Sequence, residues 1–409
     1  MQNILVFIEA NTTGTGMLAL NKAKLCGFSP VFITNNPDRY IGLEKAECSI
    51  FTCDTNNIEI LYETINNNLE VDKIQGITTT SEFYLEIVSE LAHKYSLPRN
   101  SVQAIRNCRN KLETRKCLKE GKVRQPKFEE VTSISDINKS LNIIGLPCIV
   151  KPVDDSGSNG VRFCKTVAEV KEQTLEILSW KKNSRGQATA QTVLLEEFID
   201  APEYSVEIFS FEGKGICVGI TEKKLIGFPH FVEHQHVFPA KLPIDVTRKI
   251  QNTVEDALKA VGITNGPTHT EVKLTPQGCA IIEINARLAG GMIPKLIQIS
   301  TGIDMLEYQL LLAVGKYKEP ILNYQKYAGI KFIVSDLDGI LNDIRGIEKV
   351  RTLQGVNQVN ININRGDKVI SPKNAYDRLG YVIVEGNSYE ETEARLNKSI
   401  EKLEIMVGN

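Results

Sequence analysis

A chain of 409 residues is too long for one ordinary hydrophobic core, so the length predicts two to three domains. Hydrophobic residues make up 42% and charged residues 24%, as in globular proteins, and a net charge of −2 gives no electrostatic reason to expect nucleic acid as a partner. No apolar run approaches the length of a membrane span, and the start of the chain lacks the basic segment of a signal peptide. We therefore expect a cytoplasmic protein with no membrane partner.

The N-terminal part of the chain predicts a parallel α/β domain at 1–98. Its order of strand, loop, helix and strand is typical of a doubly wound sheet. The loop contains Gly14 and Gly16 but no third glycine at the spacing of a dinucleotide fingerprint, so a tight turn is the better interpretation. The expected elements are strands at 4–8, 30–34 and 74–80, and helices at 17–27 and 81–97.

A second α/β part is expected at 99–195. The polar segment 181–190, KKNSRGQATA, predicts a mobile loop on its surface. The other expected elements are a basic helical stretch at 101–121 and strands at 128–132, 148–151, 161–164 and 193–197.

A loop rich in serine and glycine follows Lys151 in this part. Glycine lets backbone amides approach a ligand closely, so the loop could fold over a polyphosphate while the lysine neutralises phosphate charge. A plain β-turn is an equal alternative, and no P-loop motif occurs. The loop residues proposed to contact phosphate are Ser156, Gly157, Ser158 and Gly160.

An acidic segment follows and opens a third part, expected at 196–318. An apolar strand ends at Glu196 and Glu197, and a turn leads into a second acidic strand. The backbone from Glu197 through Phe198 to Ile199 could read the edge of an adenine, and Glu203 could accept hydrogen bonds from ribose hydroxyls. A solvated acidic turn is the alternative interpretation.

Three of the five histidines fall within 230–236, where the sequence is HFVEHQH. This spacing does not match the helical HExxH motif, and a structural zinc site would need a more ordered set of ligands. Phenylalanines and prolines surround the segment, which predicts a loop lining a pocket. We expect Glu233 and His236 to contact substrate and to support magnesium rather than to bind zinc.

The most informative segment is 268–291. Residues 275–279 predict a turn between two apolar strands, so a hairpin would bring Glu271 close to Glu283. Alternation along the second strand would place Glu283, Asn285 and Arg287 on one face. Carboxylate and amide oxygens suit Mg²⁺, and an arginine suits a phosphate held by that metal. An exposed strand with ordinary polar residues is the alternative.

Taken in order, these motifs resemble those of the ATP-grasp superfamily. The matching residues begin at Lys111, continue through Lys151 and the phosphate loop, and end in the acidic strands and the hairpin. The resemblance implies an α/β ATP-grasp fold with an N-terminal doubly wound domain that fits the pre-grasp domain. The C-terminal α+β segment, 319–409, is similar to the last domain of the biotin-carboxylase-like branch and ends in an amphipathic helix, SYEETEARLNKSIEKLEI.

Within the superfamily, the chain most resembles bacterial L-amino-acid ligases, which join two unprotected amino acids into a dipeptide. The resemblance rests on Glu233 and His236 before the metal acids and on Gly290 and Gly291 after Arg287. It implies that Glu233 supports magnesium and that the histidine and glycines lie at the amino-acid site. It also implies small-molecule amino-acid substrates and, because dimers are common in the family, a homodimer.

The resemblance implies a mechanism that uses ATP and roughly two or three Mg²⁺ ions, with Mn²⁺ as a substitute. Lys111 and Lys151 would hold the α- and β-phosphates, while Arg287 would grip the transferring phosphoryl group and His236 would orient substrate or take a proton. The metal acids would be Glu233, Glu271, Glu283 and Asn285.

Three questions stay open at the level of sequence. The amino acids joined and their order are not readable, although nearby glutamates would suit a basic residue such as arginine. Ser81 and Glu82 would line the second-substrate pocket, but capping of a helix explains them equally well. The alternative functions are another ATP-grasp ligase or carboxylase, acting on a different carboxylate or on bicarbonate, and a non-catalytic nucleotide-binding protein.

Overall fold

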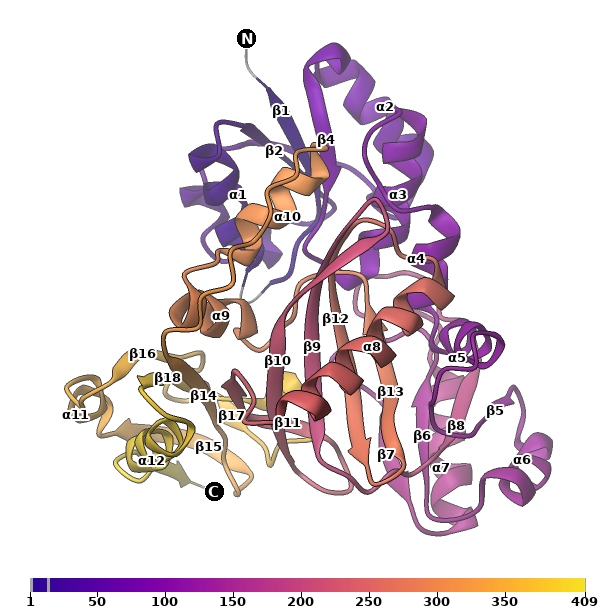
Figure 1. Ribbon diagram of the computed structural model, residues 1–409, viewed down its shortest axis with the longest axis vertical. Coiled ribbons are helices and arrows are strands. Elements are labelled where there is room, and N and C mark those ends of the chain that lie inside the picture. The colour runs from indigo at the N-terminus through magenta and orange to yellow at the C-terminus, as the bar shows by residue number, and fades with distance from the viewer. Residues whose placement is uncertain (1–2, 13–14, 409) are drawn as a thin grey trace.

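The computed structural model describes residues 3–12 and 15–408, which form four β-sheets with helices packed on them (Figure 1). The N-terminal sheet lies at the top of Figure 1 and the long strands of the largest sheet cross its middle. The C-terminal segment lies at the lower left, and a smaller sheet lies at the lower right.

The N-terminal sheet is parallel, with the order β3-β2-β1-β4, which confirms the predicted doubly wound unit. Gly16 is the first residue of the first helix. A side chain does not fit at this position, because a Cβ there would lie 1.8 Å from the backbone oxygen of Asn11. The predicted turn also includes Gly14, and residues 13–14 lie outside the described residues. The elements are β1 (Ile4–Ile8), α1 (Gly16–Leu25), β2 (Ser29–Thr34), β3 (Ser49–Thr52), α2 (Ile58–Asn68), β4 (Ile74–Thr78), the short 3₁₀ helix η4 (Glu82–Tyr84) and α3 (Leu85–Lys94).

Two helices connect this unit to the small sheet, α4 (Val102–Arg109) and α5 (Lys111–Glu120). Asn110 separates them because its side chain accepts hydrogen bonds from the first two free amides of α5. The small sheet is antiparallel, with the order β5-β8-β6-β7. Its elements are β5 (Phe128–Val131), α6 (Ile137–Ile144), β6 (Cys148–Pro152), β7 (Arg162–Cys164), α7 (Val167–Ser179) and β8 (Val193–Glu197).

The segment 181–190 is a loop, as predicted, but it packs on the N-terminal domain. Arg185 is 8% exposed and donates to the hydroxyl of Tyr40 at 3.1 Å and to the backbone oxygen of Ala10 at 3.0 Å. The amide of Asn56 donates to the backbone oxygen of Arg185 at 3.0 Å, and Gln187 donates to the backbone oxygen of Phe83 at 3.0 Å. The prediction of a mobile loop rested on its polarity alone, and these polar groups instead hold the small sheet against the first domain.

The largest sheet has eight strands in the order β13-β12-β9-β10-β11-β14-β18-β16, and every neighbouring pair is antiparallel. The helix α8 (Ile244–Val261) covers one face and packs on β10 and β13. The strands are β9 (Glu203–Phe211), β10 (Lys214–Ile226), β11 (Val232–Phe238), β12 (Gly266–Thr275), β13 (Gly278–Asn285), β14 (Tyr327–Ile333), β16 (Val356–Ile361) and β18 (Gly380–Gly386).

One expectation for this sheet is wrong. The segment around the histidines was predicted to be a loop, but β11 runs through it and carries both Glu233 and His236. The strand forms because β10 and β14 pair with it on its two sides and satisfy its backbone groups. Glutamate and three histidines in the segment hide the alternation that would otherwise indicate a strand.

The C-terminal segment combines three strands of the large sheet, β14, β18 and β16, with a separate three-stranded sheet, β17-β15-β19. The predicted C-terminal helix is correct over 389–400, but the residues after it form a strand rather than continuing the helix. The additional elements here are β15 (Gly339–Arg345), α11 (Ile347–Arg351), β17 (Lys368–Val369), α12 (Tyr389–Ile400) and β19 (Glu404–Gly408).

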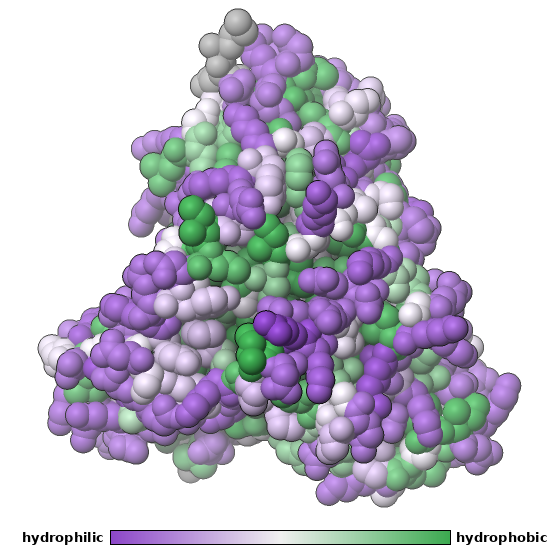
Figure 2. Space-filling view, viewed as in Figure 1, coloured by the Kyte–Doolittle hydropathy of each residue, from purple (hydrophilic) through white to green (hydrophobic). Residues whose placement is uncertain are grey.

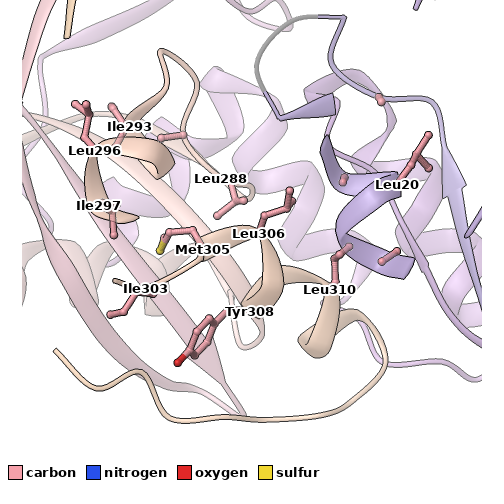
Figure 3. Close-up of a cluster of buried hydrophobic side chains, with 14 of the residues drawn as sticks. Leu20, Leu288, Ile293, Leu296, Ile297, Ile303, Met305, Leu306, Tyr308 and Leu310 are labelled. Carbon is pink, nitrogen blue, oxygen red and sulfur yellow. The ribbon is translucent and has the colours of Figure 1, made fainter. Parts of the chain in front are cut away.

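A shared hydrophobic cluster joins the N-terminal sheet to the large sheet (Figure 3). The helices α9 (Ile293–Thr301) and α10 (Met305–Ala313) both contribute to it, and α10 packs against both α9 and α1. Leu20 of α1, Leu306 of α10 and Ile330 of β14 all belong to this cluster. The burial of one continuous cluster fixes the first domain relative to the sheet that carries the predicted metal acids.

On the face shown in Figure 2, hydrophilic residues cover most of the surface, and hydrophobic residues form small groups near its middle. Across the described residues, no helix combines the length and apolar character that crossing a membrane requires.

Candidate active site

The predicted hairpin is present, with β12 and β13 paired in an antiparallel register that sets Glu271 opposite Glu283. Asn285 is the last residue of β13, opposite His269. The strand does not extend to Arg287, which lies in a bend two residues further on. The expectation that alternation alone aligns the three polar residues is therefore wrong for Arg287, because the chain leaves the sheet at that point.

Arg287 instead contacts the N-terminal domain. Its Nε lies 2.5 Å from a carboxylate oxygen of Glu82, and both side chains are nearly buried. Burial raises the pKa of Glu82, but the opposing charges of Arg287, Arg109 and Lys111 outweigh it, and the pKa is lower than usual. With its amide nitrogen turned toward the carboxylates, Asn285 donates to Glu82 and Glu283, each at 3.3 Å. One polar chain thus connects the first domain to the predicted metal acids.

Ser81 does not act as a helix cap. It precedes η4, yet its side chain makes no capping hydrogen bond, and its buried hydroxyl has no partner among the described residues. The capping alternative is therefore wrong for Ser81. Ser81 precedes Glu82 in the chain, and its hydroxyl is a buried polar group without a partner among the described residues.

The two predicted phosphate lysines lie in different electrostatic surroundings. The ammonium of Lys111 donates to the backbone oxygen of Asp155 at 2.7 Å and lies 3.2 Å from Glu283. The ammonium of Lys151 lies 2.6 Å from Glu196, and burial lowers its pKa even though that carboxylate opposes the shift. Both ammonium groups reach the same cleft from neighbouring elements.

Glu196 has a structural partner that the sequence did not reveal. Arg115, which is fully buried, binds one oxygen of Glu196 at 2.5 Å and donates to the backbone oxygens of Ile281 and Ile282. Lys151 holds the other oxygen, so both oxygens of this carboxylate are engaged. Arg115 lies one helical turn after Lys111, and this spacing on a basic helix is the only signal that could have indicated it.

A cleft lies between the small sheet and the large sheet. Its lining combines apolar side chains, including Ile149, Phe198 and Leu225, with the two lysines. This combination fits a nucleotide, whose base is apolar and flat and whose phosphates are anionic. The predicted residues that line the cleft are Lys111, Lys151, Ser156, Gly157, Ser158, Glu196, Glu197, Phe198, Ile199, Glu203, Glu233, Glu271 and Glu283.

The phosphate loop adopts a conformation that suits its glycines. Gly157, Ser158 and Gly160 all have positive φ angles, and a Cβ on Gly160 would lie 2.5 Å from the ring of Trp180. Gly160 is therefore required for packing, and it does not line the cleft. The carboxylate of Asp155 accepts hydrogen bonds from the amide of Ser156 and the side chain of Asn159.

Lys223 of β10 is the central unpredicted residue of the cleft. Its ammonium lies 2.6 Å from Glu271, 2.9 Å from Glu233 and 3.1 Å from Glu203, and its side chain is 2% exposed. Burial opposes its charge, but the three carboxylates outweigh burial and raise the pKa of Lys223 well above its usual value. Sequence reasoning missed it because Lys223 and Lys224 are adjacent, and only the fold distinguishes the buried one from the exposed one.

Glu271 and Glu283 suit a magnesium ion whose remaining ligands come from a nucleotide. Among residues 3–12 and 15–408, no three histidine, cysteine, aspartate or glutamate side chains converge closely enough to hold a metal ion by themselves. Protein Mg²⁺ sites often use one or two carboxylates and complete the shell with water and substrate phosphate. Glu271 and Glu283, opposite one another and facing the cleft, match that pattern.

His236 lies behind the cleft, next to Gly291. Its side chain is fully buried, and neither ring nitrogen has a hydrogen-bond partner among the described residues. Burial lowers the pKa of His236, although Glu233, whose oxygen lies 3.7 Å from Nε2, works in the opposite direction. A neutral imidazole with two free nitrogens can accept or donate a proton.

The surroundings of His236 include the C-terminal segment. A Cβ on Gly291 would lie 2.8 Å from Nε2 of the histidine, whereas Gly290 has open space around it. Arg378, which precedes β18, stacks over the ring of Phe332 with 3.9 Å to its centre and lies 3.5 Å from Glu233. The C-terminal segment thus contributes an arginine to the site. The sequence did not reveal it because Glu233, the carboxylate beside it, lies more than a hundred residues away along the chain.

Two regions of the chain match family models. Residues 144–295 match the ATP-grasp domain, and residues 331–408 match L-amino acid ligase C-terminal domain 2. The chain is 29% identical to the protein y4rH of Sinorhizobium fredii over 408 residues, which cover 100% of this chain and 84% of that relative. It is 30% identical over 263 residues to alanine–anticapsin ligase of Bacillus subtilis, and the match covers 59% of this chain and 55% of that relative. The chain thus spans about half the length of this second relative.

A comparison of whole structures gives the same fold. The crystal structure of L-amino acid ligase from Bacillus licheniformis superimposes with a TM-score of 0.84 and 24% sequence identity, covering 100% of this chain and 99% of that one. The fold is therefore the ATP-grasp fold, and the resemblance expected from the ordered motifs is confirmed.

Proposed function

We propose that this chain, which has an ATP-grasp domain followed by an L-amino acid ligase C-terminal domain, is an ATP-dependent ligase that joins two unprotected L-amino acids into a dipeptide. The reaction would release ADP and phosphate and pass through an acyl phosphate. The relative named alanine–anticapsin ligase supports a reaction in which an amino acid is one of the two partners.

The proposal rests on one observation: a group of side chains suited to a metal–nucleotide complex is connected to a group suited to an amino acid. Glu271 and Glu283 face a cleft that also holds Lys111 and Lys151, while Asn285 links Glu283 to the Glu82–Arg287 pair. The first group suits a metal–nucleotide complex. The second group offers a carboxylate and a guanidinium side by side, which are the complements of the ammonium and carboxylate of an amino acid.

The chemistry explains why both groups are needed. A carboxylate is a poor electrophile until its oxygen attacks the γ-phosphorus of ATP, which breaks the bond to ADP and forms an acyl phosphate. The neutral amine of the second amino acid then attacks the acyl carbon, phosphate leaves with the bonding electrons, and the nitrogen loses a proton. Magnesium, when bound, would offset the negative charge of the phosphates.

The side chains of this chain have distinct tasks in that reaction. Lys111 and Lys151 would bind the phosphates, and the 156–160 loop would cover them and exclude water from the acyl phosphate. Arg287 would hold the carboxylate that receives the phosphoryl group, and Glu82 would hold the ammonium of the same amino acid. The neutral imidazole of His236 would accept the proton that the attacking amine loses.

Two other functions share the ATP-grasp fold and are separated by one experiment. A carboxylase or purine-type ligase would use a different carboxylate or bicarbonate, and a non-catalytic binder would not turn ATP over. Phosphate release would be measured with ATP, Mg²⁺ and each common amino acid, singly and in pairs, followed by mass spectrometry. A product mass equal to two amino acids less one water, together with ADP, would establish the dipeptide ligase.

Glu283→Ala serves as the matched control in this experiment. We expect it to lose turnover by orders of magnitude with the fold retained, because one metal acid is gone. Full turnover by this variant, or turnover with bicarbonate but with no pair of amino acids, would contradict the proposal.

A further inference from the structure

The position of Lys223 has a consequence for the order in which metal and nucleotide bind. Its ammonium lies within 3.1 Å of Glu203, Glu233 and Glu271, so it lies between three carboxylates that line the cleft. The strand pairing fixes this arrangement, because Lys223 is directly opposite Glu203 on β9 and its other neighbour, β11, carries Glu233.

Each of the three carboxylates also has a second positively charged or titratable neighbour. Lys273 lies 3.8 Å from Glu203, the ring of His269 lies 3.4 Å from Glu271, and Arg378 lies 3.5 Å from Glu233. The three carboxylates therefore already contact charged or titratable side chains and are not free metal ligands. Lys223 is the one cation they share among the residues that the structure describes.

We propose that Lys223 is a positioning residue that keeps divalent metal out of the site until a nucleotide arrives. A divalent ion on Glu233 and Glu271 would stand within a few ångströms of the ammonium, and like charges at that separation in a buried site repel strongly. The phosphates of a nucleotide add negative charge to the cleft and offset this repulsion. Metal binding is thereby made conditional on nucleotide binding, so the ion enters with the phosphates rather than before them.

This inference rests on the proposed function in one respect, namely that Glu233 and Glu271 are metal acids. Its test is the affinity of full-length protein for Mn²⁺, measured by electron paramagnetic resonance without nucleotide and again with saturating ADP. The variants are Lys223→Met, which removes the charge, and Lys223→Arg, which keeps it. Lys224→Met is the matched control, because that neighbouring lysine is exposed and pairs with Glu393 on the surface.

Without nucleotide, we expect Lys223→Met to bind Mn²⁺ about tenfold more tightly than the unmodified protein, since one positive charge has left the site. Lys223→Arg and Lys224→Met should match the unmodified protein. With ADP present, the advantage of Lys223→Met should shrink to about threefold or less, because the phosphates already offset the ammonium. A merely structural role for Lys223 could weaken metal binding but would not strengthen it.

Stability provides a second measurement if Lys223→Met is poorly folded. Three carboxylates without their shared cation repel one another, so this variant should melt at a lower temperature in chelator and recover when Mn²⁺ is added. Mn²⁺ affinity of Lys223→Met equal to or weaker than that of the unmodified protein, while ADP still promotes metal binding, would overturn the role of Lys223 alone. Absence of Mn²⁺ binding in every variant, with and without ADP, would overturn this inference together with the assignment of the metal acids.

Discussion

His269 is buried, and the folded structure favours its protonated, positively charged form. Its ring lies 2.8 Å from Glu207 and 3.4 Å from Glu271. Burial alone would lower its pKa, but these two carboxylates outweigh burial and raise the pKa of His269 to about 9. An unfolded chain would have the ordinary histidine pKa of about 6.5, so the folded state binds the proton more tightly.

The difference predicts the sign of a pH effect. The stability from the charged pair is fully present below about pH 6.5 and is lost as pH rises through about 9, by roughly 3 kcal/mol in total. Urea unfolding in metal-free buffer at several pH values between 6 and 9.5 would measure this loss. His269→Gln should remove most of this pH dependence, whereas His93→Gln, an exposed histidine on α3, should retain it. An unchanged slope in His269→Gln would contradict the charged pair.

Gly291 sets the space beside His236. A methyl group there would lie 2.8 Å from Nε2 of the histidine and 3.5 Å from Glu233, and the backbone φ of +56° already disfavours a side chain. We expect Gly291→Ala to lower kcat/KM by about 10- to 100-fold, because the imidazole must move. Gly302→Ala is the control, since Gly302 has a similar φ of +77° but nothing within 4 Å of a Cβ.

Phosphate release with the substrates found for the enzyme would measure both variants, and thermal melting would check their folds. The control should lose stability to a similar extent while keeping its activity. Equal losses of activity in the two variants would mean that backbone strain, rather than the contact with His236, is responsible.

At the scale of single residues, the site residues that can be predicted from sequence are those whose partners are close along the chain. Glu271 and Glu283 are joined by a short turn, so the hairpin register could be predicted. Arg115 and Arg378 have partners far along the chain, and the meeting of three glutamates around Lys223 depends on the order of strands in the sheet. Burial decides which lysine or arginine enters the site, and a single sequence does not show burial for long charged side chains.

At the scale of elements, the loop 181–190 connects the small sheet to the N-terminal domain through Arg185. Hydrogen bonds to a charged donor contribute about 1.5–3 kcal/mol each, and Arg185 makes two of them across the contact. Arg185→Gln should therefore open the loop more often. We expect an endoprotease specific for lysine to cut at Lys181 or Lys182 about tenfold faster in this variant.

Arg248→Gln, an exposed arginine on α8, controls for the loss of a surface charge and should be cut at the rate of the unmodified protein. Saturating ATP analogue should slow cleavage if closure over the nucleotide holds the loop in place. Equal cleavage rates in Arg185→Gln and the unmodified protein would mean that the contact does not restrain the loop.

The elements that could be predicted are those with clean patterns. The apolar runs of β1, β2, β6 and β8 and the amphipathic face of α12 fall where expected. The strand β11 could not be predicted, because its polar residues lie at the candidate site and hide the apolar–polar alternation that indicates a strand. The region between residues 81 and 97 divides into a 3₁₀ turn and a shorter helix, and Glu82 of the turn contacts Arg287 from another part of the chain, a contact that local sequence patterns do not reveal.

At the scale of the whole molecule, the large sheet continues from the ATP-grasp domain into the C-terminal domain. The strand β14 pairs with β11 on one side and with β18 on the other. A chain ending at residue 326 would leave β11 as an open edge and expose the hydrophobic cluster that β14 and β18 cover. We expect this fragment to be insoluble or aggregated, as measured by its soluble fraction and by size-exclusion chromatography against the full chain. A soluble and active fragment would contradict this expectation.

This continuous sheet also constrains how such a protein can change through recombination. Domains that meet through a flexible linker can be exchanged between relatives as separate pieces. Here the junction between the two matched regions runs through hydrogen-bonded strands, with Gln235 opposite Lys331 and Phe238 opposite Ala328. A C-terminal segment taken from another enzyme would have to restore that register and supply an arginine at the position of Arg378. We therefore expect new substrate preferences to be reached more readily by point changes around the proposed amino-acid site than by exchange of the C-terminal segment.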